Sequence, residues 1–189
     1  MNSALIVSHT STGVEALLEV LARLSIAEID TAKTAGETRR LYAYRGFDLC
    51  IIHAPLPDES GTDLAIELAK RGITQVLLIV QANRLDEISH QVEDAGVAAI
   101  AKPLQMDALW SALKLLSACH HRMQLLYDEN AKLYRTIDDM RYLNRAKLLL
   151  MEKKKMGEAE AHRHIEKLAM DRRISKRDAA MFVIKSLER

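Results

Sequence analysis

The sequence predicts an α/β domain built on a parallel sheet, followed by a long helix and a small all-α module. Short apolar runs alternate with segments whose apolar residues recur at helical spacing, which is typical of a parallel sheet with helices on both faces. Charge is divided unevenly: residues 1–113 carry 9 Lys and Arg against 15 Asp and Glu, whereas residues 141–189 carry 14 against 7. The basic end is therefore a candidate surface for binding a polyanion.

Five apolar runs are expected to be strands, and helical spacing predicts the segments between them to be helices. The runs expected as strands are residues 4–7, 27–32, 47–52, 75–80 and 97–101. The segments expected as helices are residues 14–24, 35–45, 63–71, 86–96 and 106–118. In such sheets the functional site lies at the carboxyl ends of the strands. His53 directly follows the third apolar run, so it is expected at that edge of the sheet.

The stretch "DLCIIHAPLPDESG" (48–61), with "AG" at 95–96 and "KP" at 102–103, resembles the response-regulator receiver family. The resemblance covers about residues 1–118 and implies a flavodoxin-like α/β fold. The phosphorylation chemistry of the family is missing, because Ser8 and His9 replace the acid pair that binds Mg²⁺ and His53 replaces the phosphoacceptor aspartate. Gln81 stands at the switch position, and only Lys102 is retained.

Aspartyl phosphorylation needs a carboxylate nucleophile and a hard cation held by oxygen ligands. The sequence therefore predicts a receiver-like domain that is not phosphorylated, in which His53 serves packing or contact. Two other interpretations remain open. His9 and His53 could bind a transition metal, although a third ligand is not evident, or the imidazole could sense pH near neutrality.

Residues 116–142 carry a heptad pattern without Gly or Pro, which indicates that the last receiver helix continues as a coiled coil. The predicted seam consists of Leu116, Cys119, Met123, Leu126, Asn130, Leu133, Ile137 and Met140. A lone Asn at a buried a position favours a two-stranded, in-register pairing, so a parallel homodimer is expected. The alternative is an amphipathic helix that packs on its own chain.

Residues 143–189 predict three helices with a small core rich in alanine. Gly157 is expected to end the long helix, and Ser175 with Asp178 resembles a capping box at the start of the last helix. "RAKLLLMEKKKMGEAEAHRHIEKLAMDRR", followed by "DAAMFVI", resembles the ANTAR domain, an RNA-binding module of bacterial antiterminators. The order of receiver-like domain, coiled coil and ANTAR domain resembles the AmiR/NasT-type regulators. Glu166 departs from the ANTAR pattern, which often has a basic residue there.

The resemblance implies binding to stem-loops in nascent leader mRNA, with cations that contact phosphates and stack on bases. The candidate RNA-binding residues are Arg145, Lys147, Met151, Lys153, Lys154, Lys155, His162, Arg163, Arg172, Arg173, Lys176 and Arg177. His162 and His164 are equally well explained as ordinary surface histidines.

The function expected from these patterns is a cytoplasmic RNA-binding antiterminator that works as a homodimer. In similar systems a ligand-sensing protein holds the regulator inactive, and such a partner is expected here. A DNA-binding response regulator is the alternative, since a basic three-helix module can resemble a helix-turn-helix. No cofactor, metal site or membrane partner is expected, and neither a phosphate loop nor a nucleophile–base pattern suggests an enzyme.

Overall fold

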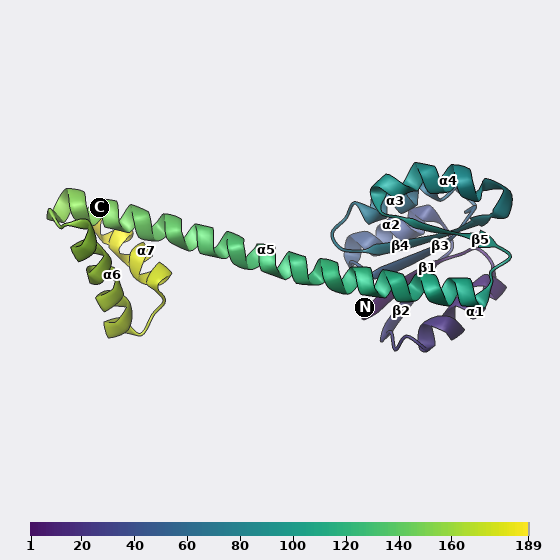
Figure 1. The fold of residues 1–189 in the computed structure, drawn as a ribbon, viewed down its shortest axis with the longest axis horizontal. Helices are drawn as coiled ribbons and strands as arrows, with labels where there is room; N and C mark the ends of the chain where they lie inside the picture. The colour runs from purple at the N-terminus through teal and green to yellow at the C-terminus, as the bar shows by residue number, and fades with distance from the viewer. Residues whose placement is uncertain (189) are drawn as a thin grey trace. The chain divides into compact units, whose positions relative to one another are not determined.

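A computed structural model describes residues 1–188 and shows a five-stranded parallel sheet in the N-terminal part of the chain (Figure 1). The strand order is β2-β1-β3-β4-β5, as in a doubly wound fold. The strands are β1 (Ser3–Val7), β2 (Glu28–Ala32), β3 (Leu49–His53), β4 (Gln75–Gln81) and β5 (Ala98–Lys102). The predicted fold class is confirmed, with each of the five apolar runs forming one strand.

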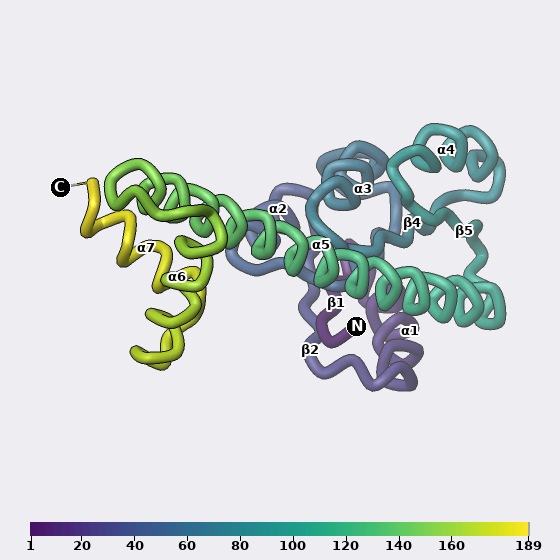
Figure 2. Tube along the Cα trace, turned by 60° about the vertical axis from the view of Figure 1, so that its left-hand side comes forward, coloured from purple at the N-terminus to yellow at the C-terminus, as the bar shows by residue number. Residues whose placement is uncertain are grey.

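Helices cover both faces of this sheet and bury two separate apolar layers (Figures 1 and 2). One layer contains side chains from α2 (Ala35–Tyr44), α3 (Thr62–Ala69) and α4 (Leu85–Val92). The other contains side chains from α1 (Ser11–Ala22) and from the first part of α5 (Met106–Lys154). Strands β1, β3 and β4 contribute to both layers, which explains why their sequences are almost continuously apolar. Two short 3₁₀ turns, Ala82–Arg84 and Glu93–Ala95, flank α4.

The register of the parallel strands brings their polar carboxyl ends to one edge of the sheet. His53 ends β3 opposite Ile79 of β4, and Gln81 ends β4 opposite Lys102 of β5. Gly61 closes the loop after β3 at φ +90°, and a Cβ at this position would lie 3.2 Å from a methyl carbon of Ile52. The close approach and the left-handed backbone together explain the glycine at this position.

The second part of the chain is a three-helix module formed by the end of α5, α6 (Glu158–Arg172) and α7 (Lys176–Leu187). The chain divides into two compact units, Met1–Leu125 and a second unit that begins at Leu126. The core of the module consists of Ala146, Leu150, Ala161, Ile165, Ala169, Ala179, Ala180, Val183 and Ile184. Short alanine side chains let the three helices approach closely, as the sequence pattern predicted.

The expected role of Gly157 is wrong in detail. Helix α5 already ends at Lys154, and Lys155 takes the left-handed backbone conformation at φ +58°. Gly157, at φ −71°, is the N-cap of α6. The predicted cap of α7 is present, because the hydroxyl of Ser175 accepts a hydrogen bond of 3.0 Å from the amide of Asp178. Among the described residues, no helix combines the length and apolar character that a membrane crossing requires.

Candidate functional site

The carboxyl edge of the sheet carries a small cluster around His53. The hydroxyl of buried Ser8 lies 3.4 Å from Nδ1 of His53 and 3.3 Å from the hydroxyl of Thr10. A Cβ added to Gly13 would lie 2.7 Å from the Thr10 hydroxyl and 3.5 Å from the His53 ring. These contacts show that short polar side chains and the imidazole fill the space at the end of β1 and β3.

The cluster contains no carboxylate among the groups that the described structure places beside His53. Lys102 donates a hydrogen bond to the carbonyl oxygen of Ala54, the residue that follows His53. Gln81 is exposed and lines a neighbouring depression with Arg84 and Ser60. The structure therefore gathers Ser8, His53 and Lys102 at one edge, whereas the side chain of Gln81 lies at the margin.

Asp58, which belongs to the loop after β3, is bound elsewhere. Its carboxylate accepts hydrogen bonds of 2.9 Å from the amides of Ala35 and Gly36 at the start of α2. These backbone donors lower the pKa of Asp58, because they stabilise its charged form. The acid that follows His53 in this loop thus caps the start of α2.

Burial, with a smaller contribution from the charges of Lys102 and His9, lowers the pKa of His53 to about 4. The ring is therefore neutral at physiological pH, although an unperturbed histidine titrates near pH ~6.5. No group of three or more His, Cys, Asp or Glu side chains that could hold a metal ion occurs within residues 1–188. The described structure supplies no third ligand to accompany His9 and His53.

The lowered pKa of His53 leads to a prediction about how the free energy of unfolding depends on pH. Between pH ~6.5 and ~4 the unfolded chain binds a proton at His53 that the folded chain does not, so stability falls as the pH falls through this window. We expect His53→Asn to flatten the pH dependence of the unfolding free energy there. Histidine titration by NMR should resolve one ring with a pKa near 4 in the folded wild type, and a His53 titration near pH ~6.5 would contradict the burial argument.

The predicted seam along α5 is exposed over most of its length. Leu126, Leu133, Ile137 and Met140 expose 51%, 55%, 49% and 57% of their surface, and Cys119 and Asn130 are also exposed. Met123 is 40% exposed, and its sulfur accepts a hydrogen bond of 3.3 Å from the Gln75 side chain. Leu116 differs, because it is 6% exposed and packs in the α/β core. The exposed seam therefore begins at Cys119.

The Lys and Arg side chains of the candidate RNA-binding set fall into two groups, and the first group is neutralised within the module. Lys147 pairs with Glu158 at 2.9 Å, and Lys176 pairs with Glu166 at 2.6 Å. Each ammonium lowers the pKa of its carboxyl partner, so both acids stay ionised. Three further ion pairs in the module are Arg145 with Glu188, Arg177 with Asp138, and Arg177 with Asp139.

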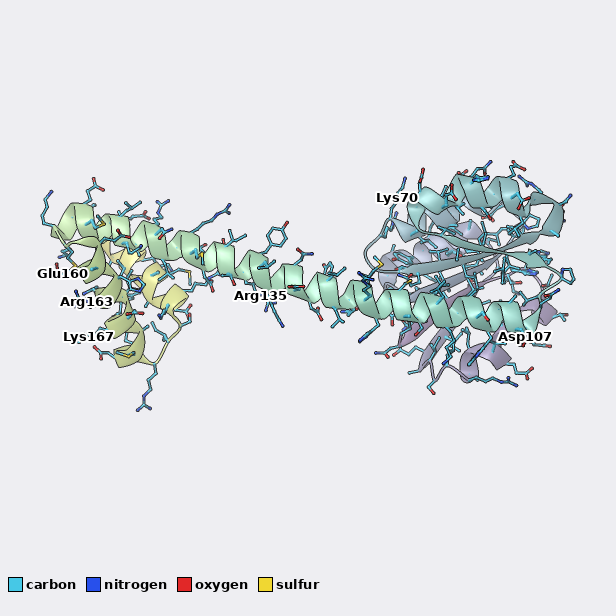
Figure 3. All side chains as sticks on the ribbon, viewed as in Figure 1. Lys70, Asp107, Arg135, Glu160, Arg163 and Lys167 are labelled. Atoms are coloured by element: carbon cyan, nitrogen blue, oxygen red, sulfur yellow. The ribbon has the colours of Figure 1, made fainter. Side chains whose placement is uncertain are left out.

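The second group has no carboxylate partner among the described residues and is exposed: Lys153, Lys154, Lys155, Arg163, Arg172 and Arg173. Lys153 donates to the carbonyl oxygen of Leu187, and Arg163 donates to that of Ala159. In Figure 3, Arg163 lies along one side of α6 with Glu160 and Lys167. These cations are the part of the predicted surface whose charge is available to an anion.

The structure brings part of the predicted set together on α5 and α6. Lys147, His162 and Arg163 line one depression with Glu158. Nε2 of His162 also lies 3.4 Å from the Glu166 carboxylate, which it shares with Lys176. Met151 is 36% exposed. Sequence reasoning missed the acids that neutralise the first group, and it also missed exposed Phe182, whose ring lies beneath Arg172.

The chain combines a receiver-like sheet domain with a basic three-helix module. Residues 131–184 match the ANTAR domain family. Over 178 residues the chain is 26% identical to the Transcriptional regulatory protein PdtaR of Mycobacterium tuberculosis (strain H37Rv), across 89% of this chain and 87% of that protein. The chain therefore carries an ANTAR domain behind a receiver-like domain, and over most of its length it is similar to a transcription regulator.

Solved structures show the same fold in the N-terminal part. One is the signal receiver domain of an HD domain-containing protein from Pseudomonas fluorescens Pf-5, with a TM-score of 0.57, 22% identity, and coverage of 65% of this chain and 90% of that chain. Another is a CheY-like receiver domain protein from Methanospirillum hungatei JF-1, with a TM-score of 0.56, 26% identity, and coverage of 65% and 98%. The likeness confirms the receiver fold.

Proposed function

We propose that the protein is a non-enzymatic antiterminator that binds stem-loops in nascent leader mRNA and thereby prevents formation of a terminator. Acting on nascent transcripts places it in the cytoplasm. The observation that carries the proposal is the ANTAR match over residues 131–184, on a module whose exposed cations include several without a carboxylate partner in the described structure. Such side chains release counterions from a phosphate backbone when they bind it.

A homodimer formed through α5 is the second part of the proposal. The seam from Cys119 to Met140 exposes apolar side chains at heptad positions on one helix, which is the pattern that two-stranded coiled coils bury. Pairing would link two ANTAR modules, and two linked weak contacts can gain ~10²–10⁴ in avidity when the spacing of two RNA hairpins fits.

Control by a ligand-sensing inhibitory protein, and not by aspartyl phosphorylation, is the third part. The cluster at the sheet edge offers a neutral imidazole where a receiver needs a carboxylate, and Asp58 is engaged at the start of α2. These features favour a non-covalent protein partner as the signal that the receiver-like surface receives.

The test uses full-length protein and a synthetic RNA pool with two short stem-loops whose loops are randomised. Binders are selected on filters at ~0.15 M salt and compared with duplex DNA of the same sequence. We expect RNA to bind more tightly, and acetyl phosphate with Mg²⁺ to change neither the affinity nor the intact mass. Equal or tighter binding of duplex DNA would favour a DNA-binding regulator, and a phosphorylated His53 or aspartate would overturn the proposed mode of control.

A further inference from the structure

Arg172 and Phe182 form a cation–π pair on the surface of the ANTAR module. Arg172 is the last residue of α6, Phe182 lies in α7, and the guanidinium carbon is 3.9 Å from the centroid of the ring. Phe182 remains 43% exposed, although the two residues that follow it in α7, Val183 and Ile184, are buried. An exposed aromatic ring therefore lies directly beside a planar cation.

Arg172 differs from the neutralised cations of the module. The structure gives it no carboxylate within ion-pair distance in the described residues, whereas Arg177, which also lies over an aromatic ring, is bound by Asp138 and Asp139. The charge of Arg172 is consequently available, and its side chain is exposed. Two apolar side chains close to it in sequence are exposed as well, with Met170 at 72% and Ile174 at 38%.

A guanidinium that stacks on a ring through one face can stack on a second π-system through the other. Unpaired bases in RNA loops are commonly bound in this way, on arginine planes and aromatic side chains. We propose that Arg172 and Phe182 form a stacking site for an unpaired loop base of the bound hairpin. This inference rests on the proposed RNA binding and adds base contact to a surface otherwise made of phosphate contacts.

The local charge favours RNA over an apolar protein partner at this site. Arg173, the next residue along the chain, is also exposed and has no carboxylate partner among the described residues, so a polyanion is attracted to this end of α6. A protein ligand that needs only apolar contact would gain little from an arginine that must be desolvated without an acid partner.

The test compares the selected hairpin RNA with the same RNA carrying abasic nucleotides in its loops. Phe182→Leu keeps apolar volume and Arg172→Lys keeps charge, but each removes one planar group. We expect each variant to bind the selected RNA about 5- to 100-fold more weakly than the wild type and to bind the abasic RNA about as well as the wild type does. Arg135→Lys, the same exchange at an exposed arginine of α5 outside the candidate RNA-binding set, is the matched control and should change affinity less than about 2-fold.

A fluorescent base analogue in the loop gives a second readout. Stacking on the wild-type protein should quench its fluorescence, and neither variant should produce this quenching. Wild-type affinity in both variants, or equal losses for intact and abasic RNA, would overturn the stacking site and leave a protein partner as the alternative for this surface. If the wild-type protein selects no binding RNA from the pool, the proposed function itself is overturned.

Discussion

Replacement of Ile165 by alanine is expected to unfold the ANTAR module while the sheet domain stays native. Ile165 is fully buried in α6, and five of the nine buried core residues of the module are alanines, so few large side chains hold the three helices together. Ile→Ala in a core costs about 2–5 kcal/mol, which approaches the whole stability of a small module. Hydrogen exchange followed by mass spectrometry on the full chain should show loss of protection in α6 and α7.

Leu148→Ala is the matched control for this variant. Leu148 lies on α5 within the same module but is 64% exposed, so its truncation leaves no cavity and should change stability by less than about 0.5 kcal/mol. Amides of β3 and β4 should keep wild-type protection in both variants, because these strands belong to the other compact unit. Full protection of α6 in Ile165→Ala would show that this residue is not central to the core.

The sequence predicted the elements of the fold because each of them has a local signal. The runs at β3 and β4 are buried on both faces and read as continuous apolar stretches, and the helices between them have regular apolar spacing. The end of α5 was predicted too late in the chain, because nothing in the sequence indicates that Lys155 takes the left-handed conformation. Gly157 is a strong sequence signal for a helix end, but in the structure it is the N-cap of α6.

The candidate RNA surface was only partly predictable. Basic residues were evident from composition, but their neutralisation depends on tertiary pairs such as Lys147 with Glu158 and Arg177 with Asp139, which lie 11 and 38 residues apart. Phe182 looked like one more apolar residue of α7, and its exposure follows only from how α6 and α7 pack. Likewise, Leu116 fits the heptad pattern but packs in the α/β core. Helix α5 contributes side chains both to that core and, further along, to the exposed seam.

A charge in the seam is expected to abolish the proposed dimer. Leu133 occupies a d position and is 55% exposed in the single chain, so Leu133→Asp would place a carboxylate from each chain in a dry interface. The loss of apolar burial alone is worth about 1.5–3 kcal/mol for each of the two leucines, which corresponds to a ~10²–10⁴-fold weaker dimer. Sedimentation velocity should show this as a monomer over the concentrations at which the wild type is paired.

Ala131→Asp is the control, because it adds the same charge two residues earlier at a heptad position that points away from the seam. It should leave pairing intact. If pairing supplies the avidity proposed above, Leu133→Asp should also bind the two-hairpin RNA ~10²-fold more weakly while its affinity for a single hairpin stays at the wild-type value. A wild-type protein that remains monomeric even with the two-hairpin RNA present would show instead that α5 covers its apolar face by some other contact.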